Sequence, residues 1–416
     1  MLKRIIATLV ALLVTSSLFA QSTADLEARV REMARQIEVL TQEIEALKTR
    51  QSEPKVVAAE EGKYGFGAAA SKVYQQSDTG VSIGGYGEML YQSPEGELAT
   101  ADSLRAVVYT GYKFSDRVLF NSELEVEHAN LERGGNVELE FAYLDYLIRP
   151  EFNLRGGLVL MPVGLTNEQH EPTAFLGARR PIVEQHIIPS TWNELGGGAF
   201  GDVGPVSYRA YFVTGLNASG FGAEESIREG RQAGGEATAE DWAAVARVDW
   251  HPVEGAMVGG SFYRGDSGQG AGFNAGVTVG EIHAQAKFRG ITLRALATRG
   301  SIGDAADIND ALGLAGDESV GSRTGGWYVE GGYELTPFTN HREMSVIPYA
   351  RYESLDTQRR VPAGFLRNPE NDQNILTLGV AFKPISQTVI KLDWQDVDNA
   401  ANTGANQWNV ALGYIF

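Results

Sequence analysis

The 416-residue chain contains no cysteine. Thiol catalysis, structural disulfides and metal sites made of thiolates are therefore excluded. The same absence fits an oxidising compartment in which the fold does not depend on disulfides. The six histidines and the serines show no spacing that marks a catalytic triad, in which a nucleophile needs a base close by. We therefore predict that the protein is not an enzyme.

Positive charge is scarce. Lysine and arginine number 35 against 53 aspartate and glutamate residues, so the net charge is -18. A protein that binds nucleic acid needs a basic surface to meet the phosphate backbone. The composition therefore predicts that nucleic acid is not a partner.

Long apolar runs are also missing. The longest apolar stretch is residues 5–14, which follows Lys3 and Arg4 and precedes Ala20. This order is typical of a secretory signal peptide, and we expect residues 1–20 to be one, cleaved after Ala20. An uncleaved membrane anchor is the alternative, although the run is shorter than the roughly 20 residues of a membrane-spanning helix. Any crossing of a membrane must then use strands.

Residues 22–50 carry a heptad pattern. Apolar residues recur in alternating steps of four and three, which predicts a periplasmic coiled coil. Such a short amphipathic helix is marginal alone, so it indicates a homo-oligomer, either a trimer or a dimer. A helix packed against its own chain is the alternative. Residues 51–80 are predicted to be a linker. The seam consists of Leu26, Val30, Met33, Ile37, Leu40, Ile44 and Leu47.

From residue 81 onward the period changes from helical to two. We predict about sixteen strands, with fourteen or eighteen as alternatives, and many have the length that a tilted strand needs to cross a bilayer. The expected strands are 81–91, 104–114, 117–128, 137–149, 153–161, 194–201, 204–214, 242–251, 256–264, 277–288, 291–299, 326–335, 344–354, 374–383, 387–396 and 407–416.

The gaps between these strands alternate between long and short. This pattern is typical of an up-and-down antiparallel barrel with tight turns on one rim and large loops on the other. The faces agree: in 242–251, Trp242 and Val248 point one way while Arg247 and Asp249 point the other. We therefore predict an all-β transmembrane barrel over residues 81–416, in the outer membrane of a Gram-negative bacterium. Its expected neighbours there are lipid and lipopolysaccharide.

The chain ends with the alternating stretch QWNVALGYIF. Its large apolar side chains, among them Leu412, Tyr414 and Phe416, share one face. An exposed apolar face on a closing strand is suited to lipid. The ending resembles that of outer-membrane barrels in general, and the resemblance implies that the barrel-insertion machinery reads these residues as an assembly signal.

A barrel of sixteen strands leaves an aqueous channel. The longest gap, 162–193, is the candidate constriction, because a long loop without its own structure is usually functional. If it folds inward it narrows the pore, and a loop folded over the rim is the alternative. The charged and titratable residues of this loop are Arg179, Arg180, Glu168, Glu171, Glu184, His170 and His186.

The run DYLIRPEFNLRGGLVLMPVGLTNE, residues 145–168, resembles the segment of phosphate-selective porins O and P that leads into their third loop. The run GGGAFGDVGPVSYRAYFVTG, residues 196–215, resembles the hairpin that follows. A coil before the barrel resembles the trimeric porins of the DcaP type, which take up small anionic solutes such as dicarboxylates. The resemblance implies a porin with a basic lumen.

We therefore predict passive diffusion of small hydrophilic solutes, which needs no cofactor, with a preference for anions such as phosphate or small carboxylates. A non-selective or cation-preferring porin, or an envelope tether that binds peptidoglycan, is the alternative. No metal site is predicted. Asp304, Asp307 and Asp310 are expected in a solvated loop, and a calcium ion held by their oxygen atoms is the alternative. The expected constriction and solute-binding residues are Arg179 and Arg180 on the loop and, placed on the inner face by the alternation along the strands, Arg155, Arg209, Arg247, Arg294, Arg351 and Lys391.

Overall fold

The computed structural model divides the chain into two units, residues 1–56 and residues 57–416. It describes residues 28, 31–32, 34–36, 38–39, 41–42, 62–130, 132, 134–335 and 344–416. The described residues of the first unit are helical and exposed, and Gln36 donates a hydrogen bond of 3.3 Å to Glu32 one turn earlier. The seven predicted seam residues lie outside the described ones, so the coiled coil stays a prediction.

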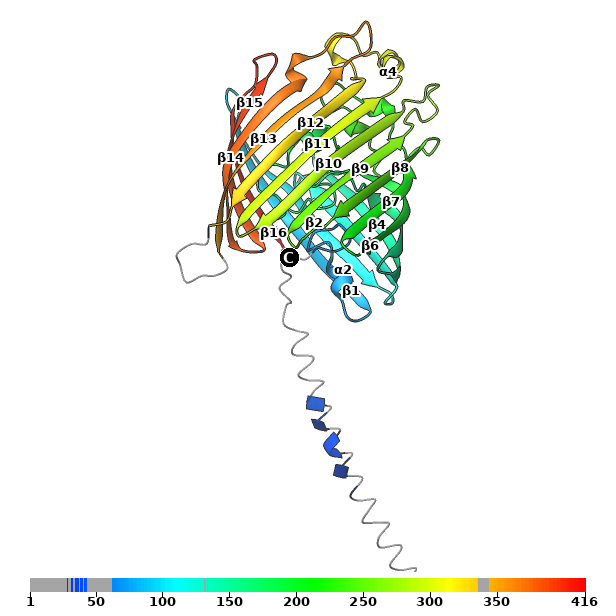
Figure 1. Ribbon diagram of the computed structural model, residues 1–416, viewed down its shortest axis with the longest axis vertical. Helices are drawn as coiled ribbons and strands as arrows, with labels where there is room; N and C mark the ends of the chain where they lie inside the picture. The colour runs from blue at the N-terminus through cyan, green and yellow to red at the C-terminus, as the bar shows by residue number, and fades with distance from the viewer. Residues whose placement is uncertain are drawn as a thin grey trace, which may run out of the picture. The chain divides into compact units, whose positions relative to one another are not determined.

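The second unit is a closed barrel in which each strand pairs with its neighbours in sequence and β1 pairs with β16 (Figure 1). The predicted number of sixteen strands is confirmed. The strands are β1 (Gly80–Pro94), β2 (Thr100–Lys113), β3 (Val118–Glu127), β4 (Asn136–Arg149), β5 (Phe152–Leu160), β6 (Asn193–Val203), β7 (Val206–Thr214), β8 (Trp242–Trp250), β9 (Ala256–Gly265), β10 (Val277–Phe288), β11 (Ile291–Ile302), β12 (Arg323–Tyr333), β13 (Ser345–Arg360), β14 (Asp372–Ile385), β15 (Thr388–Asn399) and β16 (Gln407–Ile415).

Helices in this unit are short. No helix among the described residues is long and apolar enough to cross a bilayer. The α-helices are α2 (Lys72–Gln75), α3 (Ile182–His186) and α4 (Ala305–Leu312), and the 3-10 helices are η2 (Ala218–Gly220), η3 (Arg228–Gly230), η4 (Gly316–Glu318) and η5 (Pro369–Asn371). Asp304, Asp307 and Asp310, expected in a solvated loop, are exposed, but they belong to α4 and its N-cap and not to a loop. Asp304 accepts backbone hydrogen bonds from Asn274 and Ala275 at 3.2 Å.

The last strand closes the barrel, as predicted from the end of the sequence. The register pairs Tyr86 with Ile415. Beyond it, Gly85 and Phe416 exchange backbone hydrogen bonds of 3.1 and 2.9 Å. Closure matters because an open strand edge in lipid would leave backbone groups without partners.

Side chains alternate between the two faces of the wall. On β8, Trp242, Val248 and Trp250 are exposed, whereas Arg247 and Asp249 are buried. On β16, Leu412 and Tyr414 face outward in the same way. This alternation of an apolar exterior with a charged interior confirms the predicted faces and is typical of a barrel with lipid outside.

Most connections alternate in length, and the first of the predicted long ones is shorter than expected. The connection between β1 and β2 is only residues 95–99, because both strands extend further than the sequence indicated. Gly96 has φ +82° there, which a tight turn between two long strands requires. Most of the connection between β12 and β13 lies outside the described residues.

The segment 62–79, expected as part of the linker, packs inside the barrel. Phe66 and Ala70 are 1% and 4% exposed, and α2 lies beside β1 at the rim where the chain ends (Figure 1). Tyr74 donates to Asp145 at 2.6 Å, and Asn121 donates to the Ala70 carbonyl at 2.9 Å. The small residues that read as a linker let this backbone approach the wall closely. We call residues 62–79 the N-terminal segment.

Candidate functional site

The loop of residues 161–192, between β5 and β6, reaches across the interior of the barrel. Glu184 accepts a hydrogen bond of 2.6 Å from the Tyr328 hydroxyl on β12. The Val183 amide donates to Glu353 on β13 at 3.2 Å. These strands lie far around the barrel from β5 and β6, so the loop spans its lumen. We call residues 161–192 the inner loop.

Glu184 also holds the first part of the inner loop in shape. Its carboxylate accepts hydrogen bonds from the Leu165 amide at 2.8 Å and the Thr166 amide at 2.7 Å. Gly164 has φ +77°, and a Cβ there would lie 2.5 Å from the Glu184 carboxylate. Only glycine fits this turn without displacing the carboxylate. The glycine of the PVG sequence is therefore explained by the close approach of one buried side chain.

Asn167 joins the two ends of the inner loop. Its amide nitrogen donates to the carbonyls of Met161 and Trp192 at 2.7 and 2.9 Å, and its oxygen accepts from the Trp192 amide at 2.6 Å. All three residues are fully buried. One side chain thus satisfies backbone groups at both ends of the loop, as buried polar groups require.

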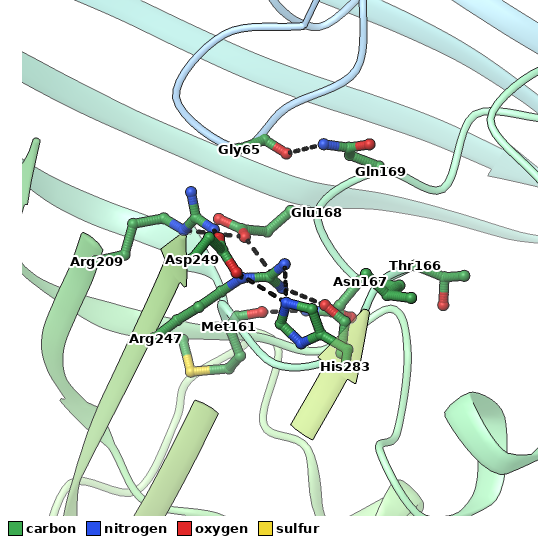
Figure 2. A network of polar contacts seen from close by, with 12 residues as sticks. Gly65, Met161, Thr166, Asn167, Glu168, Gln169, Arg209, Arg247, Asp249 and His283 are labelled. Atoms are coloured by element: carbon green, nitrogen blue, oxygen red, sulfur yellow. Dashed lines mark hydrogen bonds and ion pairs between the residues drawn. The ribbon is translucent and has the colours of Figure 1, made fainter. Parts of the chain in front are cut away.

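Two of the predicted arginines meet in a polar network that includes the inner loop (Figure 2). Arg209 lies 2.7 Å from Asp249 and 3.2 Å from Glu168 of the loop. Arg247 lies 2.8 Å from Asp249, and His283 reaches the other oxygen of the same carboxylate at 2.8 Å. The positive charge of both arginines is therefore matched by buried carboxylates.

Two further predicted arginines are paired in the same way. Arg155 makes two hydrogen bonds to Asp145, at 2.8 and 2.9 Å, and its guanidinium lies 4.0 Å from the centre of the Tyr143 ring. Arg351 lies 2.8 Å from Glu353 and 3.3 Å from Glu330. Alternation along the strands placed these arginines on the inner face correctly, but it did not indicate their partners.

Arg294 and Lys391 hold the backbone of the inner loop. Arg294 donates to the Ala174 carbonyl, and Lys391 donates to the Gly177 carbonyl at 2.8 Å. The Lys391 ammonium also lies 3.6 Å from the centre of the Phe175 ring. Arg294 on β11 and Lys391 on β15 thus both bind backbone carbonyls of the inner loop.

Arg179 and Arg180 are neighbours on the inner loop with different surroundings. Arg180 is buried and donates to the His170 carbonyl at 3.4 Å. Arg179 is half-buried inside the barrel, so part of its side chain stays accessible. Burial lowers the pKa of Arg179, and the neighbouring Glu353 and Asp393 act in the opposite direction. Arg179 lies close to another of the predicted pore residues, Arg351. The Arg351 guanidinium donates a hydrogen bond of 3.2 Å to the Arg179 carbonyl.

His186 lies near two arginines. Burial, together with the positive charges of Arg228 and Arg179, lowers its pKa to about 4. Arg228 approaches from the neighbouring loop and donates to the Gln185 carbonyl at 3.1 Å. His186 is therefore uncharged at neutral pH.

The sequence interpretation missed one cluster. Glu123, Glu125 and Glu140 converge with His170 in the interior, and each is buried. A signal existed: the runs SELEVE and NVELEF flank the connection of one hairpin, so their acidic residues had to meet across two paired strands.

No family model matches the chain. The fold is similar to that of OmpT in trimer form, an outer membrane protein of Vibrio cholerae, with a TM-score of 0.52, 12% identity and coverage of 82% of this chain and 100% of that one. It is also similar to the anion-selective porin from Comamonas acidovorans, with a TM-score of 0.52, 10% identity and coverage of 82% and 100%. At these identities the likeness shows the fold alone.

A closer relative is an uncharacterized protein of Aquifex aeolicus (strain VF5). It is 36% identical over 366 residues, which are 85% of this chain and 83% of the relative. The chain therefore belongs to one family with this Aquifex aeolicus protein, and its fold is the sixteen-stranded barrel of the outer-membrane porins.

Proposed function

We propose that this protein is an outer-membrane channel for the passive diffusion of small hydrophilic solutes, and not an enzyme. The observation that carries the proposal is the closed sixteen-stranded wall with apolar side chains outside and charged side chains inside. Barrels of this size enclose an aqueous path when their interior is polar. Passive diffusion requires no cofactor.

The inner loop is proposed to narrow this path. The support comes from its contacts with opposite parts of the wall: Glu184 with Tyr328, and the Ala178 amide with Asp393 at 2.7 Å. The N-terminal segment occupies part of the interior as well, and Gln169 of the inner loop donates to the Gly65 carbonyl at 3.1 Å (Figure 2). Solutes would pass through the space that these two segments leave.

A modest anion preference is proposed to come from Arg179. Selectivity in a channel is set by the charges that solutes meet at the narrowest point. Arg155, Arg209 and Arg351 face carboxylates, whereas Arg179 is partly exposed. The resemblance to phosphate-selective porins stays a prediction. Passage without selectivity, or with a preference for cations, is the alternative.

Assembly as a trimer through residues 22–50 is a further part of the proposal. Its support is the heptad seam in the sequence and the trimer form of one protein with a similar fold. In this arrangement each protomer has its own pore. Contact of the coil with peptidoglycan, and of the outer loops with lipopolysaccharide, is proposed on the expected location.

Liposome swelling tests the proposal. Purified full-length protein in liposomes should admit small sugars and exclude larger ones, which swelling rates in a series of uncharged sugars would measure. Protein that is folded as β-structure and inserted, but gives swelling no faster than protein-free liposomes for the smallest sugar, would overturn the channel. Circular dichroism and protease protection are the controls for folding and insertion.

A further inference from the structure

The acidic cluster of Glu123, Glu125 and Glu140 beside His170 results from the way in which β3 pairs with β4. Glu125 of β3 lies directly opposite Glu138 of β4, and the register shifts by one residue between Glu123 and Leu124. Beyond this bulge, both Glu140 and the next residue, Phe141, are buried. A bulge sets two consecutive side chains against one partner and turns the strand locally. Glu140 is thereby added to an inner face that already holds Glu123 and Glu125.

This arrangement concentrates negative charge. Glu123 and Glu125 are 0% exposed and Glu140 is 1% exposed. Like charges opposite each other on paired strands are destabilising, and burial makes the cost larger. Among the described residues, ion pairs within 4.0 Å reach these carboxylates from Arg105, 3.5 Å from Glu125, and from His170. Arg105 is also shared with Glu88 and Glu127, at 3.4 and 3.7 Å.

Some oxygens of the cluster lack hydrogen-bond partners. Within the described chain, Oε2 of Glu123 and both oxygens of Glu125 are buried without one. A buried carboxylate oxygen without a donor is costly, so a proton, a water or a cation is needed at that point to offset the cost. One ligand atom each from Glu125, Glu138 and Glu140 lie within 4.8 Å of one another, and so do one each from Glu123, Glu140 and His170.

His170 is oriented as a metal ligand is. Its Nδ1 lies 2.9 Å from the Asn167 carbonyl, which only accepts hydrogen bonds, so Nδ1 carries a hydrogen. Its Nε2 then points at Glu123 and Glu140, with oxygens at 3.2 and 3.1 Å. The Thr191 hydroxyl donates to the other oxygen of Glu140 at 2.6 Å. Outer contacts of this kind fix the direction of metal-binding imidazoles and carboxylates.

We propose that Glu123, Glu140 and His170 bind a divalent first-row transition-metal cation, which ties the inner loop to the β3–β4 hairpin. One imidazole nitrogen with two carboxylates suits such an ion. Metal–ligand distances of about 2.0–2.1 Å, at angles between octahedral and tetrahedral, place neighbouring ligand atoms about 2.8–3.4 Å apart. The two observed separations from Nε2 fall in this range. In the metal-free chain, a proton on Nε2 takes the place of the cation.

One proposed ligand lies on the inner loop and two lie on the wall, so metal binding would fix the position of the loop relative to the wall. The metal would hold the His170 end of the inner loop against β3 and β4, while Glu184 and Lys391 hold its other parts against β12 and β15. The sequence predicted no metal site, because the three ligands come from two strands and a loop and are brought together by the bulge. This inference stands apart from solute passage.

Binding of Zn²⁺ to the full-length protein in detergent tests the proposal. After treatment with a chelator, isothermal titration calorimetry should show one Zn²⁺ bound per chain. Glu140→Gln and His170→Gln should each weaken it by more than about tenfold. His251→Gln is the matched control, since His251 is exposed and lies in the turn after β8, away from the cluster. It should bind as the natural protein does.

Co²⁺ provides a second readout, because its visible absorption bands report nitrogen and oxygen ligands directly. They should appear in the natural protein and in His251→Gln, and not in His170→Gln. The proposal is overturned if the natural protein binds no Zn²⁺, or if His170→Gln binds it equally well. It is also overturned if Ca²⁺ at similar concentration displaces the ion, since a site with an imidazole ligand prefers a transition metal to Ca²⁺. Because His170 lies on the inner loop and not in a strand, the barrel of the His170→Gln variant should still fold. Resistance of the folded barrel to heat, followed by gel electrophoresis, checks its folding.

Discussion

The Tyr328 hydroxyl on β12 donates a hydrogen bond of 2.6 Å to Glu184 on the inner loop, 144 residues earlier in the chain. The same carboxylate accepts hydrogen bonds from the amides of Leu165 and Thr166. A single buried side chain therefore fixes both the internal shape of the loop and its position against the far wall. Buried polar groups with every partner in place specify one arrangement, and they are costly to disturb.

Loss of this carboxylate should loosen the inner loop. Glu184→Ala leaves two backbone amides and the Tyr328 hydroxyl without their acceptor, and should destabilise the loop by about 3 kcal/mol or more. Tyr328→Phe removes one donor and should cost about 1–2 kcal/mol. Guanidinium unfolding in detergent would measure the difference, with Glu254→Ala in an exposed turn as control. Equal stability of Glu184→Ala and the control would contradict the contacts described.

The charge of Arg179 should set ion preference. Arg179→Ala removes a partly exposed cation from the inner loop and should shift the zero-current potential toward the value set by potassium. Arg323→Ala, which removes an exposed cation on β12, is the control and should leave the potential unchanged. If the zero-current potential shifted in Arg323→Ala but not in Arg179→Ala, the charge that sets ion preference would not be that of Arg179.

Removal of the N-terminal segment should widen the path. Deletion of residues 62–76 takes away groups that pack against β3 and β4, among them the buried Phe66 and the half-buried Tyr74. Single-channel conductance in planar bilayers should rise. Deletion of residues 22–50 is the matched control, and conductance per pore should stay the same. If deletion of 62–76 leaves conductance unchanged in a folded protein, the segment does not limit passage.

Acid should weaken the structure through His186. Its pKa is about 4 in the folded protein and near 6.5 when unfolded, so the unfolded chain binds the proton more tightly. The stability held by the uncharged imidazole is complete above pH 6.5 and is lost as the pH falls toward 4. The loss should reach about 3 kcal/mol at pH 4. Unfolding free energies at pH 7 and pH 4 should therefore differ less in His186→Gln than in the natural protein.

The wall of the barrel could be predicted because each strand alternates apolar residues, which face outward, with polar residues, which face the interior. Trp242, Arg247 and Val248 on β8 lie on the faces that alternation assigned to them. Strand number and closure follow from the same local pattern, repeated along the chain. The alternation does not define the strand ends, because β1 and β2 extend further than their apolar alternation does.

The contacts inside the barrel could not be predicted, because they join residues that are far apart in the sequence and follow no regular spacing. The N-terminal segment looks like a linker, yet the Ala69 amide donates to Glu171, 102 residues later, at 3.0 Å. The alternation placed Arg155 and Arg351 inside but could not show that each faces a carboxylate. The bulge that turns Glu140 inward is likewise a property of the pairing of β3 with β4 and not of either strand alone.

The most direct test of the channel is the current through purified protein in a planar bilayer under a potassium chloride gradient. We expect discrete conductance steps and a zero-current potential of the sign set by chloride. A potential of the sign set by potassium would contradict the anion preference and leave the channel standing. The absence of any step, from protein that is folded as β-structure and inserted in the bilayer, would contradict the channel itself.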